Sequence, residues 1–219
     1  MSGPASENVS TFSPRRDAAI ADTIQPMTHT HTHTHTHTHT HTPAPSPWIT
    51  RFSALIPAGR QVLDLACGQG RHARYLQAQG LQVTGVDRDG AALQSLQSDT
   101  AGEWLQADIE NGAWPLEGRL FDAVVVTNYL WRPLWPRILA SVAPGGLLLY
   151  ETFAQGNEAY GKPSRPDFLL QPGELLQVCA GWSVIAYEAG LLRSPERVVQ
   201  RIAARRPHGA SPLPATPLP

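Results

Sequence analysis

A glycine-rich segment in the first half of the chain carries the residues best suited to hold a small charged ligand. Residues 62–72 read VLDLACGQGRH, a pattern that predicts the end of a strand, a tight turn and the start of a helix. Glycines let the backbone approach a ligand closely, and the exposed N–H groups of a helix start favour anions. In open parallel sheets, ligands bind at such turns, beyond the carboxyl ends of the strands.

Asp64 limits which ligand this turn can hold. The Gly68-x-Gly70 spacing by itself also fits a dinucleotide-binding turn, so a nicotinamide-dependent oxidoreductase is one alternative. A carboxylate at Asp64 would face a pyrophosphate with like charge, whereas it suits a ligand that carries an ammonium and a sulfonium group. The acid therefore favours S-adenosylmethionine over a nicotinamide dinucleotide.

Two further acids follow in register with the predicted strands. Asp87 ends one strand, where a carboxylate can accept hydrogen bonds from both hydroxyls of a ribose. Asp108 follows the next strand and is placed to accept from an adenine amino group. The three acids are spaced by roughly 20 residues, the length of one strand–helix repeat with its loops.

Alternating strand and helix signals supply the elements that position these acids. Strands are predicted at 61–65, 82–86, 104–106, 121–127, 147–150, 183–187 and 198–202, and helices at 46–56, 71–79, 91–97, 134–142 and 173–180. Repeated β-α-β units predict a mostly parallel sheet with helices on both faces. The last two strands have no helix between them, so one of them is expected to run antiparallel.

The motif at 64–70, together with Asp87 and Asp108, resembles the first three cofactor motifs of class I S-adenosylmethionine-dependent methyltransferases. A Pro-Gly-Gly turn at 144–146 before an apolar run is similar to the helix-to-strand turn of that family. The resemblance covers roughly residues 46–206. It implies an α/β, Rossmann-like, doubly wound sheet of seven strands in the order 3-2-1-4-5-7-6, with strand 7 antiparallel.

The resemblance also implies which residues bind S-adenosylmethionine. It assigns the methionine part to Asp64 and the backbone of 68–70, the ribose to Asp87 and the adenine to Asp108. His72, in the first turn of the helix, is a candidate contact for the methionine carboxylate. The predicted cofactor-binding residues are Asp64, Ala66, Cys67, Gly68, Gly70, His72, Asp87, Arg88, Ala107, Asp108, Ile109, Thr127 and Asn128.

The methyl acceptor is less well defined. Residues 168–176 and 181–182 resemble a segment of the tellurite-resistance methyltransferase group, whereas 127–134 and 151–158 look similar to an uncharacterised bacterial branch. Tellurite or a related chalcogen is therefore one candidate acceptor among several.

Three residues near the predicted ends of strands four and five are catalytic candidates. Tyr129 could line the acceptor pocket, Arg132 could clamp an anionic acceptor, and Glu151 could act as a base. Core packing, a surface ion pair and a structural cap are the respective alternatives. Methyl transfer from a sulfonium depends mainly on proximity and alignment, so a base is needed only for an acceptor proton of high pKa.

Composition favours a small-molecule acceptor. The 219 residues include 17 basic and 18 acidic side chains, for a net charge of -1, which provides no surplus for sequence-independent nucleic-acid binding. A nucleic-acid substrate remains an alternative. Two cysteines are too few for a disulfide framework, and no run of 18 apolar residues predicts a membrane span. We expect a cytoplasmic protein, monomeric or homodimeric, with no membrane partner.

The two ends of the chain are expected to be disordered. Residues 1–45 include a Thr-His repeat with seven histidines, His29, His31, His33, His35, His37, His39 and His41, and residues 207–219 are proline-rich. The repeat can capture metal adventitiously, and no resident metal site is predicted. A metal-buffering protein, or a fold that binds the cofactor without turnover, is the non-enzymatic alternative.

Overall fold

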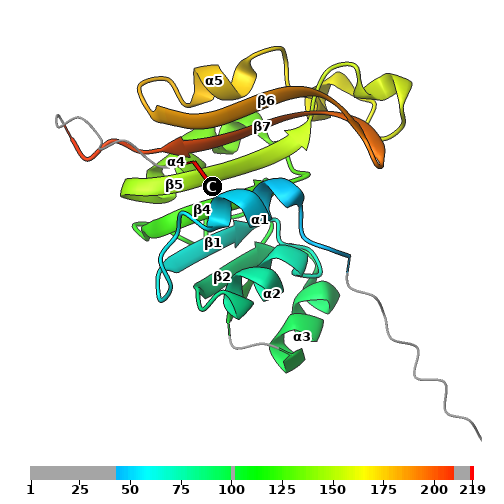
Figure 1. Ribbon diagram of the computed structural model, residues 1–219. Helices are drawn as coiled ribbons and strands as arrows, with labels where there is room; N and C mark the ends of the chain where they lie inside the picture. The colour runs from blue at the N-terminus through cyan, green and yellow to red at the C-terminus, as the bar shows by residue number, and fades with distance from the viewer. Residues whose placement is uncertain (1–42, 100–101, 210–217) are drawn as a thin grey trace, which may run out of the picture. The chain divides into compact units, whose positions relative to one another are not determined.

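Seven strands form one sheet in the order β3-β2-β1-β4-β5-β7-β6 (Figure 1). The computed structural model describes residues 43–99, 102–209 and 218–219. Strands β1 to β5 pair in parallel, and β7 runs antiparallel to both β5 and β6. The predicted strand order and the predicted antiparallel last strand are therefore confirmed.

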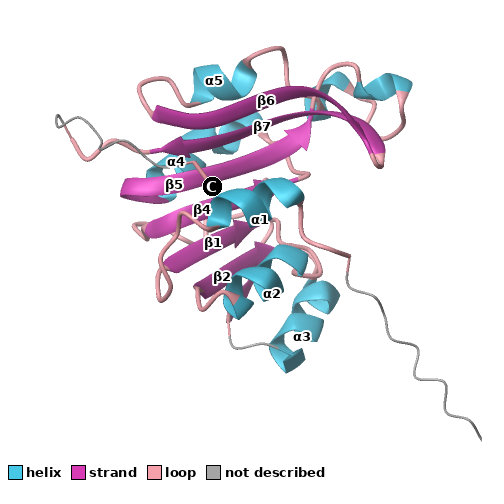
Figure 2. Cartoon of the chain, in the orientation of Figure 1, coloured by secondary structure: helices cyan, strands magenta, loops and turns pink. Residues whose placement is uncertain are grey.

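The elements follow the predicted alternation of strands and helices (Figure 2). The strands are β1 (Gln61–Leu65), β2 (Gln82–Asp87), β3 (Glu103–Gln106), β4 (Phe121–Thr127), β5 (Val142–Phe153), β6 (Ser183–Arg193) and β7 (Glu196–Arg205). The α-helices are α1 (Pro47–Ser53), α2 (Arg71–Ala78), α3 (Gly90–Asp99), α4 (Trp135–Ser141) and α5 (Glu174–Val178). Three short 3-10 helices are η1 (Arg132–Leu134), η2 (Asn157–Ala159) and η3 (Pro166–Phe168).

Two hydrophobic cores lie on opposite faces of the sheet because successive side chains of a strand point to opposite sides. On one face, Phe52 of α1 and Leu76 of α2 pack with Val125 of β4. On the other face, Ile138 of α4 packs with Val124, the preceding residue of the same strand. The central parallel strands are buried on both faces, which explains why they read as continuous apolar runs.

The start of α1 is fixed as its sequence predicts. Ser46 is the N-cap, and its hydroxyl accepts from the Trp48 N–H at 3.2 Å. The Trp48 indole N–H donates to the Ile202 carbonyl at 3.3 Å, which ties α1 to β7. The first helix is thereby joined to the strand farthest from it in sequence.

Several elements differ in length from the prediction. Pro136 lies in the first turn of α4, where its missing N–H breaks no helical bond, so the helix begins at Trp135 and tolerates it. Strands β6 and β7 form a hairpin that pairs as far as Arg193 with Glu196, well beyond the predicted end at Tyr187. Backbone pairing continues there although the apolar pattern has stopped, because an antiparallel neighbour supplies the hydrogen bonds.

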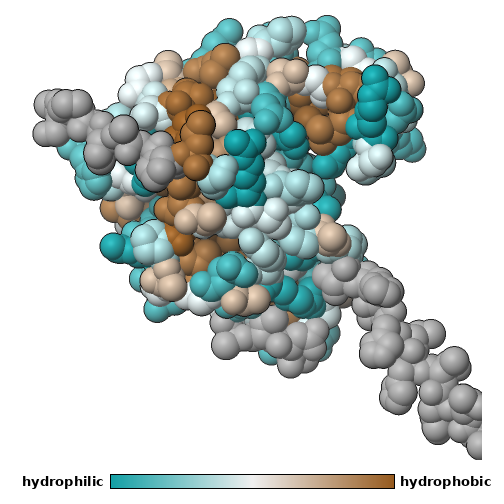
Figure 3. Space-filling model, viewed as in Figure 1, coloured by the Kyte–Doolittle hydropathy of each residue, from teal (hydrophilic) through white to brown (hydrophobic). Residues whose placement is uncertain are grey.

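The face shown in Figure 3 carries a band of apolar surface that crosses β6, β7 and β5. Val184, at the start of β6, is 42% exposed. A second, smaller apolar patch lies at the upper right of the same view, and most of the remaining surface of this face is hydrophilic or intermediate.

Some predictions fall outside the described residues. They include the disorder of residues 1–42 and 210–217 and the metal affinity of the Thr-His repeat. Within the part of the chain that the structure describes, no helix is long and apolar enough to cross a membrane, and no cluster of acids, histidines and cysteines forms a metal site. The cytoplasmic location and the oligomeric state remain predictions.

Candidate active site

Three adjoining pockets open at the carboxyl ends of the parallel strands. The first, of about 200 Å³, is lined by Ala66, Asp87, Arg88, Ala107, Asp108, Ile109, Glu110 and Tyr129. The second, of about 330 Å³, is lined by Pro43, Ala66, Cys67, Gly68, Gln69, Arg71, His72, Thr127 and Asn128. The third, of about 340 Å³, is lined by Glu110, Asn128, Tyr129, Leu130, Thr152, Phe153, Pro163 and Phe168. Shared lining residues make the three pockets neighbours.

The first two pockets gather all but two of the predicted cofactor-binding residues. The exceptions are Asp64, which lies beneath the surface, and Gly70. A Cβ on Gly70 would lie 2.2 Å from the Leu96 side chain, so this glycine is required for packing against α3. Gly68 differs: its φ is +53° and an added Cβ would meet no protein atom within 4 Å. Open space for a ligand therefore lies at Gly68.

Asp64 is buried near the end of β1. Its side chain is 1% exposed, and neither carboxylate oxygen has a hydrogen-bond partner among the described residues. Burial raises its pKa to about 7, although the Ala73 backbone and the charge of Arg71 offset part of the rise. A buried acid of this kind is suited to a cationic group brought by a ligand.

Asp87 joins the glycine-rich turn to the end of β2. Its Oδ2 accepts from the Gly68 N–H at 2.7 Å, and its Oδ1 accepts from the Asp89 N–H at 2.9 Å. The carboxylate also lines the first pocket, beside Arg88. It retains lone pairs for further donors, since each oxygen can accept more than one hydrogen bond.

Asp108 lies exposed at the opposite rim of the first pocket. Its Oδ1 accepts from the N–H groups of Glu110 and Asn111 at 3.0 and 3.1 Å, and its Oδ2 accepts from the Asn111 amide at 3.1 Å. These bonds, led by the one from the Asn111 side chain, lower the pKa of Asp108. The acid thus shapes its own turn and still faces the pocket.

Both ring nitrogens of His72 are occupied within the protein. Nε2 accepts from the Ser46 N–H at 3.1 Å, so Nδ1 carries the proton and lies 3.2 Å from the Thr127 hydroxyl oxygen. Burial, helped by the charge of Arg71, lowers the pKa of His72 to about 3. These contacts give His72 a structural role, and its predicted contact with a carboxylate gains no support from the geometry.

Arg71 is a pocket residue that the sequence prediction missed. It lines the second pocket, and its Nη2 is buried without a hydrogen-bond partner in the described part of the chain. Burial, followed by repulsion from Arg197, lowers its pKa. The unmatched guanidinium donor makes Arg71 a better candidate than His72 for an anionic group of a ligand. Its place at the first position of α2, inside the quoted motif, is the signal that could have found it.

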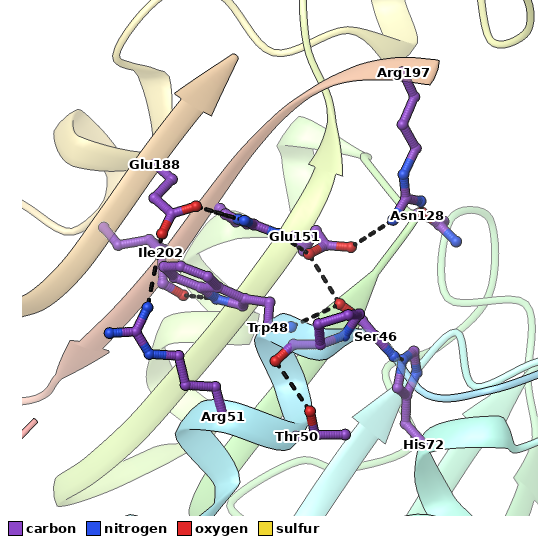
Figure 4. Close-up of polar contacts among 12 residues, drawn as sticks. Ser46, Trp48, Thr50, Arg51, His72, Asn128, Glu151, Glu188, Arg197 and Ile202 are labelled. Atoms are coloured by element: carbon purple, nitrogen blue, oxygen red, sulfur yellow. Dashed lines mark hydrogen bonds and ion pairs between the residues drawn. The ribbon is translucent and has the colours of Figure 1, made fainter. Parts of the chain in front are cut away.

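Glu151, a predicted base, is the centre of a buried ionic network (Figure 4). Its side chain is 0% exposed and accepts from the Ser46 hydroxyl at 3.0 Å, from Arg197 at 3.1 Å and from Arg201 at 3.4 Å. Arg197 also donates to Asn128 Oδ1 at 3.3 Å. Glu151 lines none of the three pockets. Its contacts indicate a structural role, and the role as a base stays an untested prediction.

Arg132, a predicted anion clamp, is similarly committed. Its Nε and Nη2 donate to the two carboxylate oxygens of Glu174, each at 2.8 Å. Its Nη1 and Nη2 donate to the carbonyls of Asp167 and Leu169, both at 2.9 Å. Arg132 lines none of the three pockets, so these contacts favour the alternative of an ion pair, here one that holds residues 167–174 in place.

Tyr129 is the catalytic candidate that does face the pockets. It lines both the first and the third, and its hydroxyl is buried without a hydrogen-bond partner among the described residues. Burial and the nearby Glu110 carboxylate raise the pKa of this hydroxyl. The tyrosine therefore stays protonated and stands between two pockets, with its O–H group beside the Glu110 carboxylate.

The comparisons with known proteins agree with this arrangement. Residues 62–146 match a family model described as a methyltransferase domain. A malonyl-(acyl-carrier protein) O-methyltransferase of Pectobacterium atrosepticum is 34% identical over 116 residues, which make up 49% of this chain and 45% of that protein. An uncharacterized methyltransferase of Mycobacterium bovis is 38% identical over 109 residues, 46% of this chain and 54% of that protein. The chain spans about half the length of these curated relatives.

A solved structure shares the fold over a longer stretch. The crystal structure of TehB from Haemophilus influenzae matches with a TM-score of 0.62 at 21% identity, covering 75% of this chain and 63% of that one. At this identity the match shows a common fold and leaves the chemistry to be argued from the site.

The first prediction concerns the stability cost of Asp64. Its folded pKa of about 7 lies above the ordinary value of 3.8, so its carboxyl opposes folding increasingly as pH rises from 4 through 7. Asp64→Asn should therefore stabilise the ligand-free protein by about 1–3 kcal/mol at pH 8 and by much less at pH 4.5. Urea unfolding at both pH values measures the difference. Glu117→Gln, at an exposed site, is the control, and a stabilisation independent of pH would contradict the assignment.

The second prediction concerns Glu151. Glu151→Gln leaves two arginines short of a buried counter-charge and should lower the free energy of unfolding by roughly 3 kcal/mol or more. Glu188→Gln is the matched control, because Glu188 also pairs with Arg201 but its side chain is 46% exposed. The control should cost under about 1 kcal/mol. Equal losses in the two variants would show that burial of Glu151 carries no special weight.

Proposed function

We propose that this chain is a class I S-adenosylmethionine-dependent methyltransferase and that it transfers the methyl group of S-adenosylmethionine to a small-molecule acceptor. The match of residues 62–146 to a methyltransferase-domain model supports the proposal. The observation that carries the proposal is the join between two pockets of opposite chemical character at the Gly68 turn. One is walled by acids and the other contains a cationic donor without a partner.

The first pocket is assigned to the adenosine part of the cofactor. Asp87 stands at the end of β2, where its remaining lone pairs can accept the ribose hydroxyls. Asp108 on the rim is placed to accept from the adenine amino group, as the sequence predicts. The Ile109 side chain and the Ala107 methyl give an apolar floor for the base.

The second pocket is assigned to the methionine part. Its ammonium can donate to the buried Asp64 carboxylate oxygens, which have no hydrogen-bond partner among the described residues, and its carboxylate can accept from Arg71 Nη2, which has none either. The open space beside Gly68 lets the chain between these groups lie against the backbone. Buried atoms of Asp64 and Arg71 that lack a hydrogen-bond partner in the described part of the chain are thus matched by the two charged groups of one ligand.

The bound cofactor supplies a methyl group on a sulfonium, whose positive charge makes the sulfur a good leaving group. The protein's part is to align the acceptor with that methyl group and to exclude water, which can contribute about 7–11 kcal/mol in favourable cases. We assign these tasks to the ends of β4 and β5, because Asn128 and Tyr129 lie there between the cofactor pockets and the third pocket.

The charges near the site favour a small acceptor over a nucleic acid. A phosphate backbone would require uncommitted arginines or lysines around the opening. Arg132 and Arg197 are instead paired with Glu174 and Glu151. Arg71 and Arg88 line the two pockets that we assign to the cofactor.

The third prediction tests cofactor binding directly. Titration calorimetry should show micromolar binding of S-adenosylmethionine and S-adenosylhomocysteine and none of NAD. Asp87→Ala should weaken both by about 1–3 kcal/mol, or roughly 5- to 150-fold, because it removes hydrogen bonds to a charged acceptor. Asp89→Ala is the matched control: it removes an acid two residues away that accepts from the Ala91 and Ala92 N–H groups of α3. If the wild-type protein bound neither S-adenosylmethionine nor S-adenosylhomocysteine, the proposed function would be wrong.

The fourth prediction uses the pKa of Asp64. An ammonium beside Asp64 stabilises the ionised carboxylate, so binding should release a proton and the affinity should rise as pH passes from 6 to 8 through about 7. The gain is at most tenfold per pH unit below that pKa. In Asp64→Asn the affinity should be low and nearly independent of pH over this range. An unchanged pH profile in the variant would place the ammonium elsewhere.

A further inference from the structure

The third pocket stands where an acceptor must approach, and its lining indicates what that acceptor is. We propose that it takes a flat, largely apolar molecule that is uncharged or cationic and presents a hydroxyl or amine group to the methyl donor. This inference rests on the proposed function and adds the chemical class of the acceptor.

The walls of the third pocket are mainly apolar and aromatic. Tyr129 and Leu130 follow β4, Phe153 ends β5, and Pro163 and Phe168 come from the segment between β5 and α5. Aromatic faces of this kind bind planar rings by stacking and by edge-to-face contact.

The segment that supplies the outer wall is tied down at several points. Ala154 and Leu170 form an isolated parallel β-bridge, so the ends of the segment meet. The buried Asn157 donates to the Pro163 carbonyl and accepts from the Val198 N–H, both at 3.0 Å. Since these contacts hold Pro163 in place, the pocket is largely preformed.

No basic side chain lines the third pocket. Three arginines near it are engaged with acids: Arg132 with Glu174 at 2.8 Å, Arg165 with Asp167 at 2.8 Å, and Arg197 with Glu151 at 3.1 Å. Arg88 lines the first pocket, which we assign to the cofactor, and not the third. Glu110 is the only charged residue of the lining, and none of the ion pairs found in the described residues includes it. An anionic acceptor would meet repulsion here without a compensating cation. The pocket therefore disfavours the oxyanion that a clamp at Arg132 would bind.

The polar groups of the lining define how the acceptor is oriented. Arginine can only donate, so the Asn128 atom that faces Arg197 is the carbonyl oxygen. The Asn128 N–H₂ group is then left as a donor at the border of the second and third pockets. Glu110 can accept from a hydroxyl or an ammonium, and the Tyr129 hydroxyl beside it completes a set that recognises a donor-bearing heteroatom.

Methyl transfer to such an acceptor forms one bond, breaks one bond and releases one proton. The acceptor oxygen or nitrogen forms a bond to the methyl carbon as the carbon–sulfur bond breaks, and the sulfur keeps the electron pair. The proton displaced from the acceptor passes to the Glu110 carboxylate and from there to solvent.

A matched set of ring compounds tests the proposal. Phenol, tyramine and 4-hydroxybenzoate share a phenol ring and are neutral, cationic and anionic. Their dissociation constants would be measured by ligand-observed NMR on the full chain saturated with S-adenosylhomocysteine. Phenol and tyramine should bind, and 4-hydroxybenzoate should bind at least tenfold more weakly than tyramine. Glu110→Gln should reduce that preference to within about threefold.

Two exposed apolar side chains, one inside the pocket lining and one outside it, test whether the ring compounds bind in the third pocket. Phe168→Ala, at a residue that is 38% exposed, should weaken phenol and tyramine at least fivefold. Leu176→Ala, at a residue that is 41% exposed and outside the pocket lining, should leave both unchanged.

The outcomes separate the two proposals. Tighter binding of 4-hydroxybenzoate, or displacement of tyramine by selenite, would overturn the proposed acceptor class while the methyltransferase assignment stands. Failure of all three rings to bind protein that does bind S-adenosylhomocysteine would do the same. Failure of S-adenosylhomocysteine itself to bind would overturn the proposed function and this inference with it.

Discussion

The buried carboxylate of Glu151 is the interaction on which the arrangement of the site depends. It joins the N-cap of α1 through Ser46, the β6–β7 hairpin through Arg201, and the end of β4 through Arg197 and Asn128. Removing one partner from such a buried network leaves an uncompensated charge in a medium that solvates it poorly. The network therefore sets the position of Asn128, which sits at a φ of +54° where the pockets meet.

The contrast with Asp64 is instructive because both acids are buried at strand ends. Glu151 is matched by cations that belong to the protein, whereas Asp64 has no hydrogen-bond partner within the described residues. The first arrangement stabilises the fold and fixes geometry. The second lowers the stability of the ligand-free protein, and a ligand that donates to the carboxylate offsets that cost when it binds. Arg71 repeats this pattern with the opposite sign.

The contacts of Arg132 bear on the chemical class of the acceptor. The sequence places Arg132 near the end of β4, where an anion clamp is a reasonable expectation. In the folded chain its guanidinium donates hydrogen bonds to Glu174 and to two backbone carbonyls. The third pocket therefore keeps mainly apolar walls and a single acid, Glu110. A side chain that holds a wall in place and one that touches the substrate can have the same position in the sequence. Their hydrogen-bond partners tell them apart.

The sequence by itself determined the alternation of strands and helices and the residues that gather at the carboxyl ends of the strands, and its resemblance to class I methyltransferases implied the strand order. The apolar pattern, the glycine-rich turn and the acids at 64, 87 and 108 are local features, and parallel strands bring consecutive strand ends to one edge. Strand lengths in the hairpin escaped prediction because cross-strand pairing, and not the apolar pattern, extends them.

Only the tertiary structure decided which side chains face a ligand. His72, Glu151 and Arg132 are engaged by residues far away in the chain, and Gly70 is required by a contact with Leu96 of another helix. Long-range partners of this kind leave no periodic signal in the sequence. Whether a charged side chain binds a substrate or supports the fold depends on which groups contact it in the folded protein. The packing of distant elements decides those contacts.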